Sequence, residues 1–377
     1  MNPRRTWAVA RKEFLHVLRD FRSLGMAILI PVMMLILFGF ALTLDVDNVP
    51  LAVWDQSATG RSRELVSRFD GSRYFSLQMR VDNYRDLIHA IDAGQVMMGL
   101  VIPRDFAERI DAGREAPVQL IVDGADSNTA TIAIGYASVL AEIYSLDLAV
   151  ERNQRRGGPA VKIPLDVRPR VWFNEELESK NYIIPGLIAV LMMVIAAMLT
   201  SLCIAREWEQ GTMEQLISTP VRVSELIVGK LFPYFVIGIF DVLLAVLMGE
   251  FIFDVPLRGN VALLFGTSAL FLVGALSMGM AISIVTKSQL LSSQIAMVAT
   301  FLPSFLLSGF IFTIANMPQA IQAVTYVVPA RYFVVILKGI YLKGVGLEIL
   351  AGQIILLLIY GAVMLTLAGV KLKKKLG

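Results

Sequence analysis

The chain has 377 residues, of which 56% are hydrophobic and only 17% are charged, whereas soluble globular domains contain roughly 25% charged residues. The apolar residues gather in discrete runs, which is the pattern of a polytopic membrane protein. A net charge of +3 is too small to indicate a nucleic-acid partner. The single cysteine, Cys203, excludes an internal disulfide or a zinc cluster, and no metal site is expected because His16 and His89 lack partners at a suitable spacing.

The first predicted element is a basic amphipathic helix over residues 6–23, in a cytoplasmic segment 1–23. Helices of this type lie along membrane surfaces. The alternative is a helix docked on a protein core, which we consider weaker because a predicted span follows directly. The apolar side consists of Trp7, Ala10, Phe14, Val17, Leu18 and Phe21, and the charged residues Arg11, Lys12, Glu13, Arg19 and Arg22 fall mostly on the other side.

Six transmembrane helices are predicted. The first, at 24–44, is long enough to span a bilayer and exceeds the apolar core of a signal peptide, so we interpret it as a retained anchor. The other five follow a long polar segment, within residues 181–377. They are predicted at 183–204, 231–253, 261–285, 290–312 and 349–370.

Lysine and arginine predict which side of the membrane each loop occupies, because they are enriched in cytoplasmic loops. They gather before the first span, in the loop 205–230, at Lys287 and after the last span, whereas the loop 254–260 holds only Arg258. We therefore expect both termini in the cytoplasm, the segment 45–180 outside, and a multi-pass protein of the cell membrane, meaning an inner or plasma membrane.

The segment 45–180 predicts a mixed α/β extracytoplasmic domain, inserted between the first two spans. A turn at 123–128 starts a long helix that ends near Gln154. A period-two pattern over 161–167 predicts a further strand, at an edge because of its prolines. The other strands are predicted at Leu51–Trp54, Phe75–Arg80, Val96–Ile102 and Val118–Val122, and the other helices at 60–70, 84–93 and 104–112.

The region 313–348 is apolar but interrupted by prolines and cations. It predicts either a re-entrant hairpin, which survives at membrane depth only when protein buries its backbone, or an interfacial loop. The sequence favours neither. The interrupting residues are Pro318, Pro329, Arg331, Lys338 and Lys343.

Two features inside the spans carry polar or small side chains. Asp241 lies within 231–253, where an ionised group costs about 2.5–3.5 kcal/mol on insertion scales. It is either a polar point on a substrate or ion path or, as we favour, part of a hydrogen bond between helices. Ala275, Gly279 and Ser283 are four residues apart and predict a close packing face, within the chain or between subunits.

A mixed-charge stretch, Arg206–Pro220, separates two apolar runs, and its polar side chains must face water or another protein. No catalytic motif accompanies it. A P-loop is excluded because Leu231 follows Gly229-Lys230 and Ser224 stands where the motif needs glycine. Neither G-x-S-x-G nor H-E-x-x-H occurs. We therefore expect no catalysis by this chain alone.

These motifs resemble those of the permease subunits of ABC-2 type exporters, and most closely the multidrug-type subgroup with a large domain between the first two spans. The resemblance covers nearly the whole chain. It rests on R-E-W-E-x-G-T-M-E-x-L-x-x-T-P at 206–220, followed by Glu225 and Gly229-Lys230, and on L-S-G-F-I-F at 307–312, N-M-P at 316–318 and V-P-A-R-Y-F at 328–333.

The resemblance implies that a coupling segment, 205–222, contacts a separate P-loop ATPase, which binds ATP and magnesium, so that this chain holds no cofactor. The charges of the segment would pair across the subunit boundary, and Gly211 would allow a turn. The region 313–333 would form short re-entrant helices near the outer exit. The implied coupling residues are Arg206, Glu207, Glu209, Gly211, Thr212, Glu214, Thr219 and Pro220, and those of the exit hairpin are Ser308, Gly309, Pro318, Pro329 and Arg331.

The resemblance also implies a function: the transmembrane subunit of an exporter that moves a drug-like or lipid-like amphiphile. A second permease subunit, of the same or a related chain, would complete the pathway, and a two-membrane cell could add a periplasmic adaptor and an outer-membrane duct. Charge reversal at Glu207 or Glu209 is expected to uncouple ATP hydrolysis from export and leave folding intact.

Other function classes compete with the exporter. An ABC-linked mechanotransmission protein would drive its external domain without transport, but such proteins typically have four spans rather than six. A sensor or receptor without an ATPase leaves the segment 206–220 unexplained.

Overall fold

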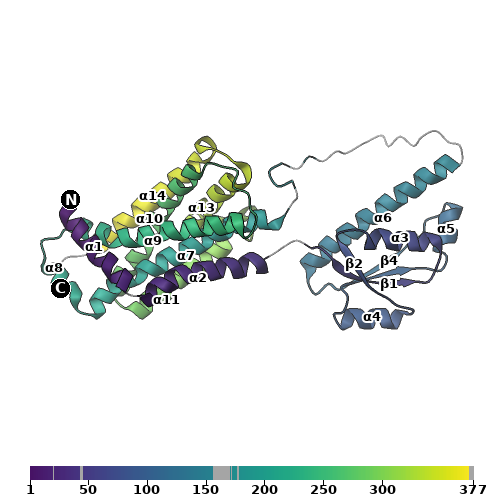
Figure 1. Cartoon of the computed structure of the whole chain (residues 1–377), viewed down its shortest axis with the longest axis horizontal. Helices are drawn as coiled ribbons and strands as arrows, with labels where there is room; N and C mark the ends of the chain where they lie inside the picture. Colours follow the sequence, from purple (N-terminus) through teal and green to yellow (C-terminus); the bar gives the residue numbers. More distant parts are fainter. Residues whose placement is uncertain (20, 43–45, 156–169, 171, 176–177, 373–377) are drawn as a thin grey trace. The chain divides into compact units, whose positions relative to one another are not determined.

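The computed structural model contains two compact units, shown in Figure 1: a helical unit made of Met1–Thr43 and Arg170–Gly377, and an α/β unit, Leu44–Pro169. The edge strand predicted at 161–167 lies outside the described residues. The structure describes the chain except for residues 20, 43–45, 156–169, 171, 176–177 and 373–377.

The α/β unit contains the predicted alternation of strands and helices, and each described element begins and ends within two residues of its predicted bounds. The mixed α/β prediction is therefore confirmed. The strands are β1 (Val49–Asp55), β2 (Phe75–Arg80), β3 (Met98–Ile102) and β4 (Gln119–Val122). The helices are α3 (Gly60–Asp70), α4 (Tyr84–Asp92), α5 (Phe106–Ala112) and α6 (Ser127–Arg155).

The four strands form one mixed sheet in the order β2-β1-β3-β4, in which β1 is parallel to β2 and β3, and β4 is antiparallel to β3. Parallel strands need cover on both faces. Helices α3, α5 and α6 bury one face, and α4 covers the other. Gly99 on β3 makes this second contact close, because a Cβ there would lie 2.8 Å from Leu87 of α4.

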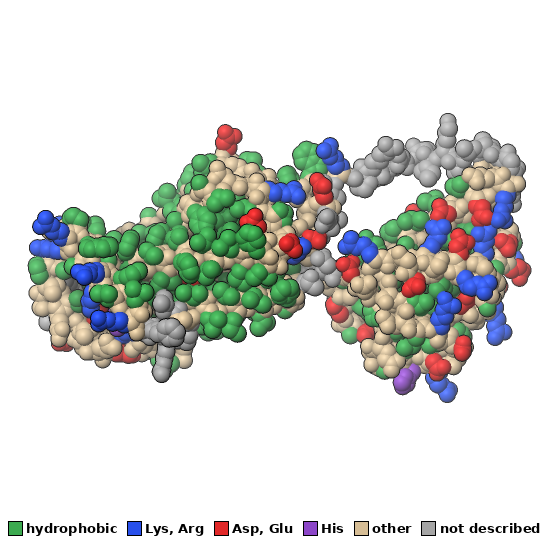
Figure 2. Space-filling view, viewed as in Figure 1, with side chains coloured by type: hydrophobic (Ala, Val, Ile, Leu, Met, Phe, Trp, Pro, Cys, Tyr) green, Lys and Arg blue, Asp and Glu red, His purple; other side chains and the backbone are tan. Residues whose placement is uncertain are grey.

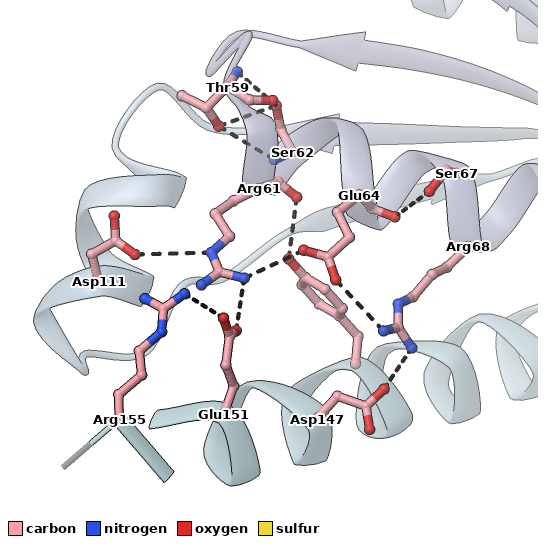
Figure 3. A network of polar contacts seen from close by, with 11 residues as sticks. Thr59, Arg61, Ser62, Glu64, Ser67, Arg68, Asp111, Asp147, Glu151 and Arg155 are labelled. Atoms are coloured by element: carbon pink, nitrogen blue, oxygen red, sulfur yellow. Dashed lines mark hydrogen bonds and ion pairs between the residues drawn. The ribbon is translucent and has the colours of Figure 1, made fainter. Parts of the chain in front are cut away.

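Ion pairs join α6 to α3 along their exposed edges (Figure 3). Arg61 Nη1 lies 2.9 Å from Glu151 Oε2, and Arg68 Nη1 lies 2.7 Å from Asp147 Oδ2. The hydrogen bond to Glu151 raises the pKa of the Arg61 guanidinium. Isolated ion pairs on a surface contribute little to the free energy of folding. The main effect of this network is therefore to fix the position of α6 on α3.

The helical unit contains the remaining helices. A short 3-10 turn and a π turn interrupt its last part. The helices are α1 (Pro3–Arg19), α2 (Phe21–Ala41), α7 (Ser179–Glu209), α8 (Thr212–Ser218), α9 (Val223–Phe251), α10 (Val261–Thr286), α11 (Gln289–Leu307), η1 (Ile314–Asn316), α12 (Gln319–Thr325), α13 (Pro329–Lys338), η2 (Gly339–Lys343) and α14 (Leu347–Lys371).

Helix α7 is the centre of the helical unit, because it contacts α2, α9, α10, α11 and α13. The small residues predicted to form a packing face do so inside the chain, against α7. A Cβ at Gly279 would collide with the Ala197 carbonyl, and Ser283 Oγ accepts hydrogen bonds from the backbone N–H groups of Ile204 and Ala205. Thr200 Oγ1 donates back to the Leu276 carbonyl at 2.8 Å.

Among the residues that the structure describes, six helices are long and apolar enough to cross a membrane: α6, α7, α9, α10, α11 and α14. All but α6 correspond to predicted spans. The predicted span 24–44 corresponds to α2, whose described apolar part, Ala27–Ala41, is shorter. Helix α6 passes the same criterion, yet it belongs to the α/β unit, where Ala133, Ala137 and Tyr144 pack one of its sides on the core. The chain is thus a polytopic helical membrane protein with a small mixed sheet.

The two units differ in the kind of side chain on their surfaces, as Figure 2 shows. Apolar side chains cover most of the visible face of the helical bundle, as expected for a surface that contacts lipid, whereas charged side chains are spread over the α/β unit. In the region 313–348, α12 and the continuous stretch Pro329–Lys343 form a pair bent by 83°. This bend fits a broken span, which is not among the predictions from the sequence, or the predicted re-entrant hairpin, and the choice between hairpin and interfacial loop stays a prediction.

The contact between α4 and the sheet yields a test of the α/β core. Leu87→Ala should destabilise this unit by about 2–5 kcal/mol, because Leu87 is fully buried and its loss leaves a cavity. Hydrogen exchange of the full-length protein in nanodiscs should show faster exchange of β1 and β3. The matched control Arg85→Ala, at an exposed site on the same helix, should leave exchange unchanged. Equal protection in the two variants would contradict this packing.

Candidate functional site

The coupling segment, 205–222, begins in the last residues of α7, a helix that is longer than the hydrocarbon core of a membrane is thick. The 31 residues of α7 reach about 46 Å, against a hydrocarbon core of roughly 30 Å. Gly211 then has a φ of +71°, a left-handed conformation that favours glycine, and α8 begins at the next residue. The predicted turn at Gly211 is confirmed, and it lets the short helix α8 leave the axis of α7.

Helix α1 lies on α9, next to this segment. Its buried side chains are Val9, Ala10, Glu13 and Val17, which share one face. Gly229 on α9 permits the approach, since a Cβ there would lie 2.8 Å from the Val9 side chain. Figure 1 shows α1 and α8 at the same end of the helical unit.

A buried ionic cluster joins α1, α7 and α9. Lys230 of α9 is 1% exposed, and its ammonium donates to Glu13 of α1 and to Glu207 of α7, the latter at 3.0 Å. Lys12 donates to the same Glu207 oxygen at 3.1 Å, and Thr212 of α8 donates to the other one. Two carboxylates thus face two ammonium groups, and the formal charges cancel.

This cluster corrects the prediction for Glu207. The resemblance implied that its charge would pair across a subunit boundary, but its carboxylate is 10% exposed and already pairs within the chain. Breaking a buried pair by removing one partner costs about 3–5 kcal/mol, because the other charge remains desolvated. We therefore expect charge reversal at Glu207 to destabilise the fold, whereas the resemblance implied that folding would survive it.

Glu209 also has partners within the chain. Its Oε1 accepts a hydrogen bond of 2.8 Å from the backbone N–H of Gln289, and its Oε2 accepts from the side-chain amide of the same residue. Gln289 is the first residue of α11, where a carboxylate is stabilised by the unpaired N–H groups and dipole of the helix. Glu209 thus holds the end of α7 beside the start of α11.

Helix α8 has one buried and one exposed side. Met213 is buried and Leu216 is half-buried, whereas Glu214, Gln215 and Ser218 are exposed. Glu214 has neither a hydrogen bond nor an ion pair with any residue that the structure describes. The exposed side of α8 is therefore the part of the coupling segment that is open to another protein.

The remaining predicted coupling residues contact the N-terminal region. Arg206 Nη1 lies 2.8 Å from His16 Nε2, and Arg5 Nη1 donates to the Pro220 carbonyl at 2.7 Å. Thr219 is half-buried at the end of α8. Glu225, in the first turn of α9, accepts a hydrogen bond from the backbone N–H of Asn2 at 2.6 Å.

The outward face of α1 retains the apolar residues that predicted a membrane-surface helix. Trp7 is 62% exposed and Phe14 is 38% exposed, while Trp7 also packs edge-on against Phe232 of α9. Arg11, Lys12 and Arg19 are exposed. The helix therefore docks on protein with one face and leaves an apolar stripe free, so the two interpretations of the sequence describe different faces of one helix.

The residues predicted for the exit hairpin fall in two places: Ser308 and Gly309 directly follow α11, and the other three belong to the bent pair of α12 and α13. Gly309 has a φ of +80°, and its carbonyl accepts from Tyr182 of α7 and Lys338 of α13, both at 3.3 Å. Arg331 donates to Thr325 and stacks 3.8 Å from the Tyr326 ring centroid. Ser308 is buried, while Pro318 and Pro329 mark the starts of α12 and α13.

Asp241 does not form the interhelical hydrogen bond that we favoured from the sequence. It is 2% exposed, and both of its carboxyl oxygens lack a hydrogen-bond partner among the described residues. It lines a small cavity between α2, α7 and α9.

The sequence patterns do not indicate the roles of Glu13 and Lys230. Lys230 belongs to the Gly229-Lys230 motif, and Glu13 is one of several charges on the amphipathic helix. Glu13 occupies the i+4 position after Val9 and before Val17, so its place on the docking face was the available signal. The described residues include no group of histidine, cysteine or carboxylate side chains suited to a metal ion.

Comparisons with known proteins cover almost the entire chain. The family described as ABC-2 family transporter protein matches residues 21–370. The chain is 38% identical over 374 residues to the probable multidrug ABC transporter permease YbhS of Escherichia coli, covering 99% of this chain and 98% of that protein. The E. coli probable multidrug ABC transporter permease YbhR is 31% identical over 348 residues, 92% of each chain. The E. coli inner membrane transport permease YhhJ is 26% identical over 333 residues, covering 87% of this chain and 86% of that protein.

The ionic cluster yields a stability test. Lys230→Met retains an unbranched side chain but leaves Glu13 and Glu207 without their shared ammonium, so we expect a loss of about 3–5 kcal/mol and a lower Tm in detergent. Lys12→Met is the matched control. The Lys12 side chain is 55% exposed, and its loss should cost less than about 1 kcal/mol. Equal Tm values for the two variants would show that the buried cluster does not stabilise the fold.

Proposed function

The chain belongs to the ABC-2 family of transporter proteins as a multi-pass transmembrane subunit, and we propose that it is the permease of an ATP-driven exporter. A separate P-loop ATPase binds ATP and magnesium in this proposal, consistent with the lack of a P-loop motif here. Two relatives named as probable multidrug permeases support a drug-like or lipid-like amphiphile as the substrate.

One observation carries the proposal: the coupling segment is anchored on one side and open on the other. The buried cluster fixes α7, α9 and α1 to one another, and Thr212 connects α8 to Glu207. The exposed Glu214 side of α8 is left for the ATPase. When two ATPase subunits close on ATP, force on α8 reaches the bases of α7 and α9 through this cluster.

The remaining parts of the complex follow from the same proposal. The coupling segment and both termini face the cytoplasm, the α/β unit lies outside, and the α12–α13 bend is near the outer exit. A second permease, the same or a related chain, forms the other half of the pathway. The inner membrane is the proposed location, which the name of the relative YhhJ supports. A periplasmic adaptor and an outer-membrane duct would extend the pathway in a two-membrane cell.

The direct experiment is mild-detergent purification of this chain from its native membrane, followed by mass spectrometry and reconstitution into liposomes. A P-loop ATPase should accompany the chain, and ATP should drive export of an amphiphile. If no ATPase accompanies the chain under several mild conditions, the exporter proposal fails. An ATPase that hydrolyses ATP without moving any amphiphile would point to mechanotransmission instead.

A substitution at Glu214 tests whether α8 docks on the ATPase without disturbing the fold of the chain. Glu214→Lys should change the free energy of unfolding by less than about 0.5 kcal/mol, and so leave the Tm nearly unchanged, since the side chain is exposed. It should reduce the amount of co-purified ATPase by roughly tenfold or more, as charge reversal at an interface does. Glu348→Lys, at an exposed position in the first turn of α14, is the matched control and should retain the ATPase. Full ATPase recovery and export with Glu214→Lys would contradict docking at α8.

A further inference from the structure

Asp241 is a buried carboxyl that no described residue satisfies. It lies near the middle of α9, is 2% exposed, and both of its oxygens lack a hydrogen-bond partner in the described chain. Among the described residues of the same unit, the Ser304 and Tyr341 hydroxyls and the Asn181 Oδ1 also lack a partner, but Asp241 is the ionisable carboxyl of this group. By contrast, Lys230 on the same helix binds two carboxylates. Buried polar groups are normally satisfied, so an unsatisfied carboxyl calls for a functional explanation.

The cavity beside Asp241 contains no other polar side chain. Its walls come from Pro31 and Leu35 of α2, Ile188 and Met192 of α7, and neighbouring residues of α9 and α7. All nine lining residues other than Asp241 are apolar, so no cation and no second titratable group faces the carboxyl from any of the three helices. The volume is about 10 Å³, which is room for a single water molecule at most.

We propose that Asp241 binds the positively charged group of the substrate, so that lipophilic cations are the substrate class of this exporter. The inference rests on the export function proposed above. An apolar wall suits the hydrophobic body of an amphiphile, and a single carboxyl within it selects the sign of the charge. A neutral amphiphile would form no ion pair with the carboxyl, and an anion would disfavour its ionisation and likewise form no ion pair.

The charge balance of the step is simple. An ionised carboxyl without a partner is strongly disfavoured in an apolar cavity, so the empty site holds the carboxyl in its neutral, protonated form. When the cavity between α2, α7 and α9 opens and an organic cation enters, the carboxyl releases its proton to water and pairs with the cation. One positive charge replaces another, and the net charge of the site does not change.

The test compares two ions of the same shape and opposite charge, tetraphenylphosphonium and tetraphenylborate. Equilibrium dialysis would measure their binding to the full-length chain in lipid nanodiscs, with empty nanodiscs subtracted. The wild type should prefer the cation, and Asp241→Asn, which keeps the volume of the side chain, should weaken cation binding by roughly tenfold or more. Glu250→Gln, at an exposed position on the same helix, is the matched control and should bind like the wild type.

Two results would overturn the proposal: a wild type without preference for the cation, or an Asn variant that binds the cation as well as the wild type does. If Asp241→Asn fails to fold, calorimetry on the wild type decides, in two buffers of different ionisation enthalpy. Cation binding should then release about one proton at mildly acidic pH, and the absence of proton release would refute the proposed exchange. ATP-driven export of neutral or anionic amphiphiles without cation binding would reject this inference and retain the exporter function.

Discussion

The contact between Lys230 and two carboxylates is the constraint on which the coupling end of the molecule depends. It joins residues that are 217 and 23 positions apart in the chain, and it brings α1, α7 and α9 together at one buried point. Because each partner would be left as an unpaired buried charge if another moved away, the three helices are held together more strongly than apolar contact alone would hold them. A force applied to α8, which is bonded to Glu207 through Thr212, therefore acts on a rigid base.

Helix α7 extends this rigidity through the bundle. It is packed on several sides by other helices, and its close contact with α10 depends on Gly279 and on the hydroxyls of Thr200 and Ser283. At its other end, the Tyr182 hydroxyl donates to the Gly309 carbonyl, and the Lys338 ammonium lies 3.3 Å from the centre of the Tyr182 ring. One helix thus connects the ionic cluster with the turn after α11 and with the last residue of α13, so a displacement of one end of α7 can be passed to these contacts at its other end.

The sequence predicted what depends on local patterns. Alternating strands, turn residues and hydrophobic runs are local, and the strands of the α/β unit and five long spans were placed correctly from them. The partners of Glu207 and Glu13 could not be predicted, because the Lys230 ammonium reaches them from a distant part of the chain. The docking face of α1 was hidden for a different reason: Trp7 and Phe14 dominate the amphipathic pattern, yet they lie on the exposed side.

Helix α9 contains two buried ionisable residues, and the difference in their surroundings suits them to different roles. Lys230 and Asp241 are 11 positions apart in the sequence, about three helical turns, so both face α7. At Lys230 the chain supplies every partner, and the desolvated charges stabilise a fixed contact. At Asp241 the described part of the chain lines the cavity with apolar side chains and gives the carboxyl no partner. A satisfied buried charge is suited to transmitting force, because moving its partners apart is costly. An unsatisfied carboxyl is suited to binding, because only a ligand of opposite charge removes its desolvation penalty in the ionised form.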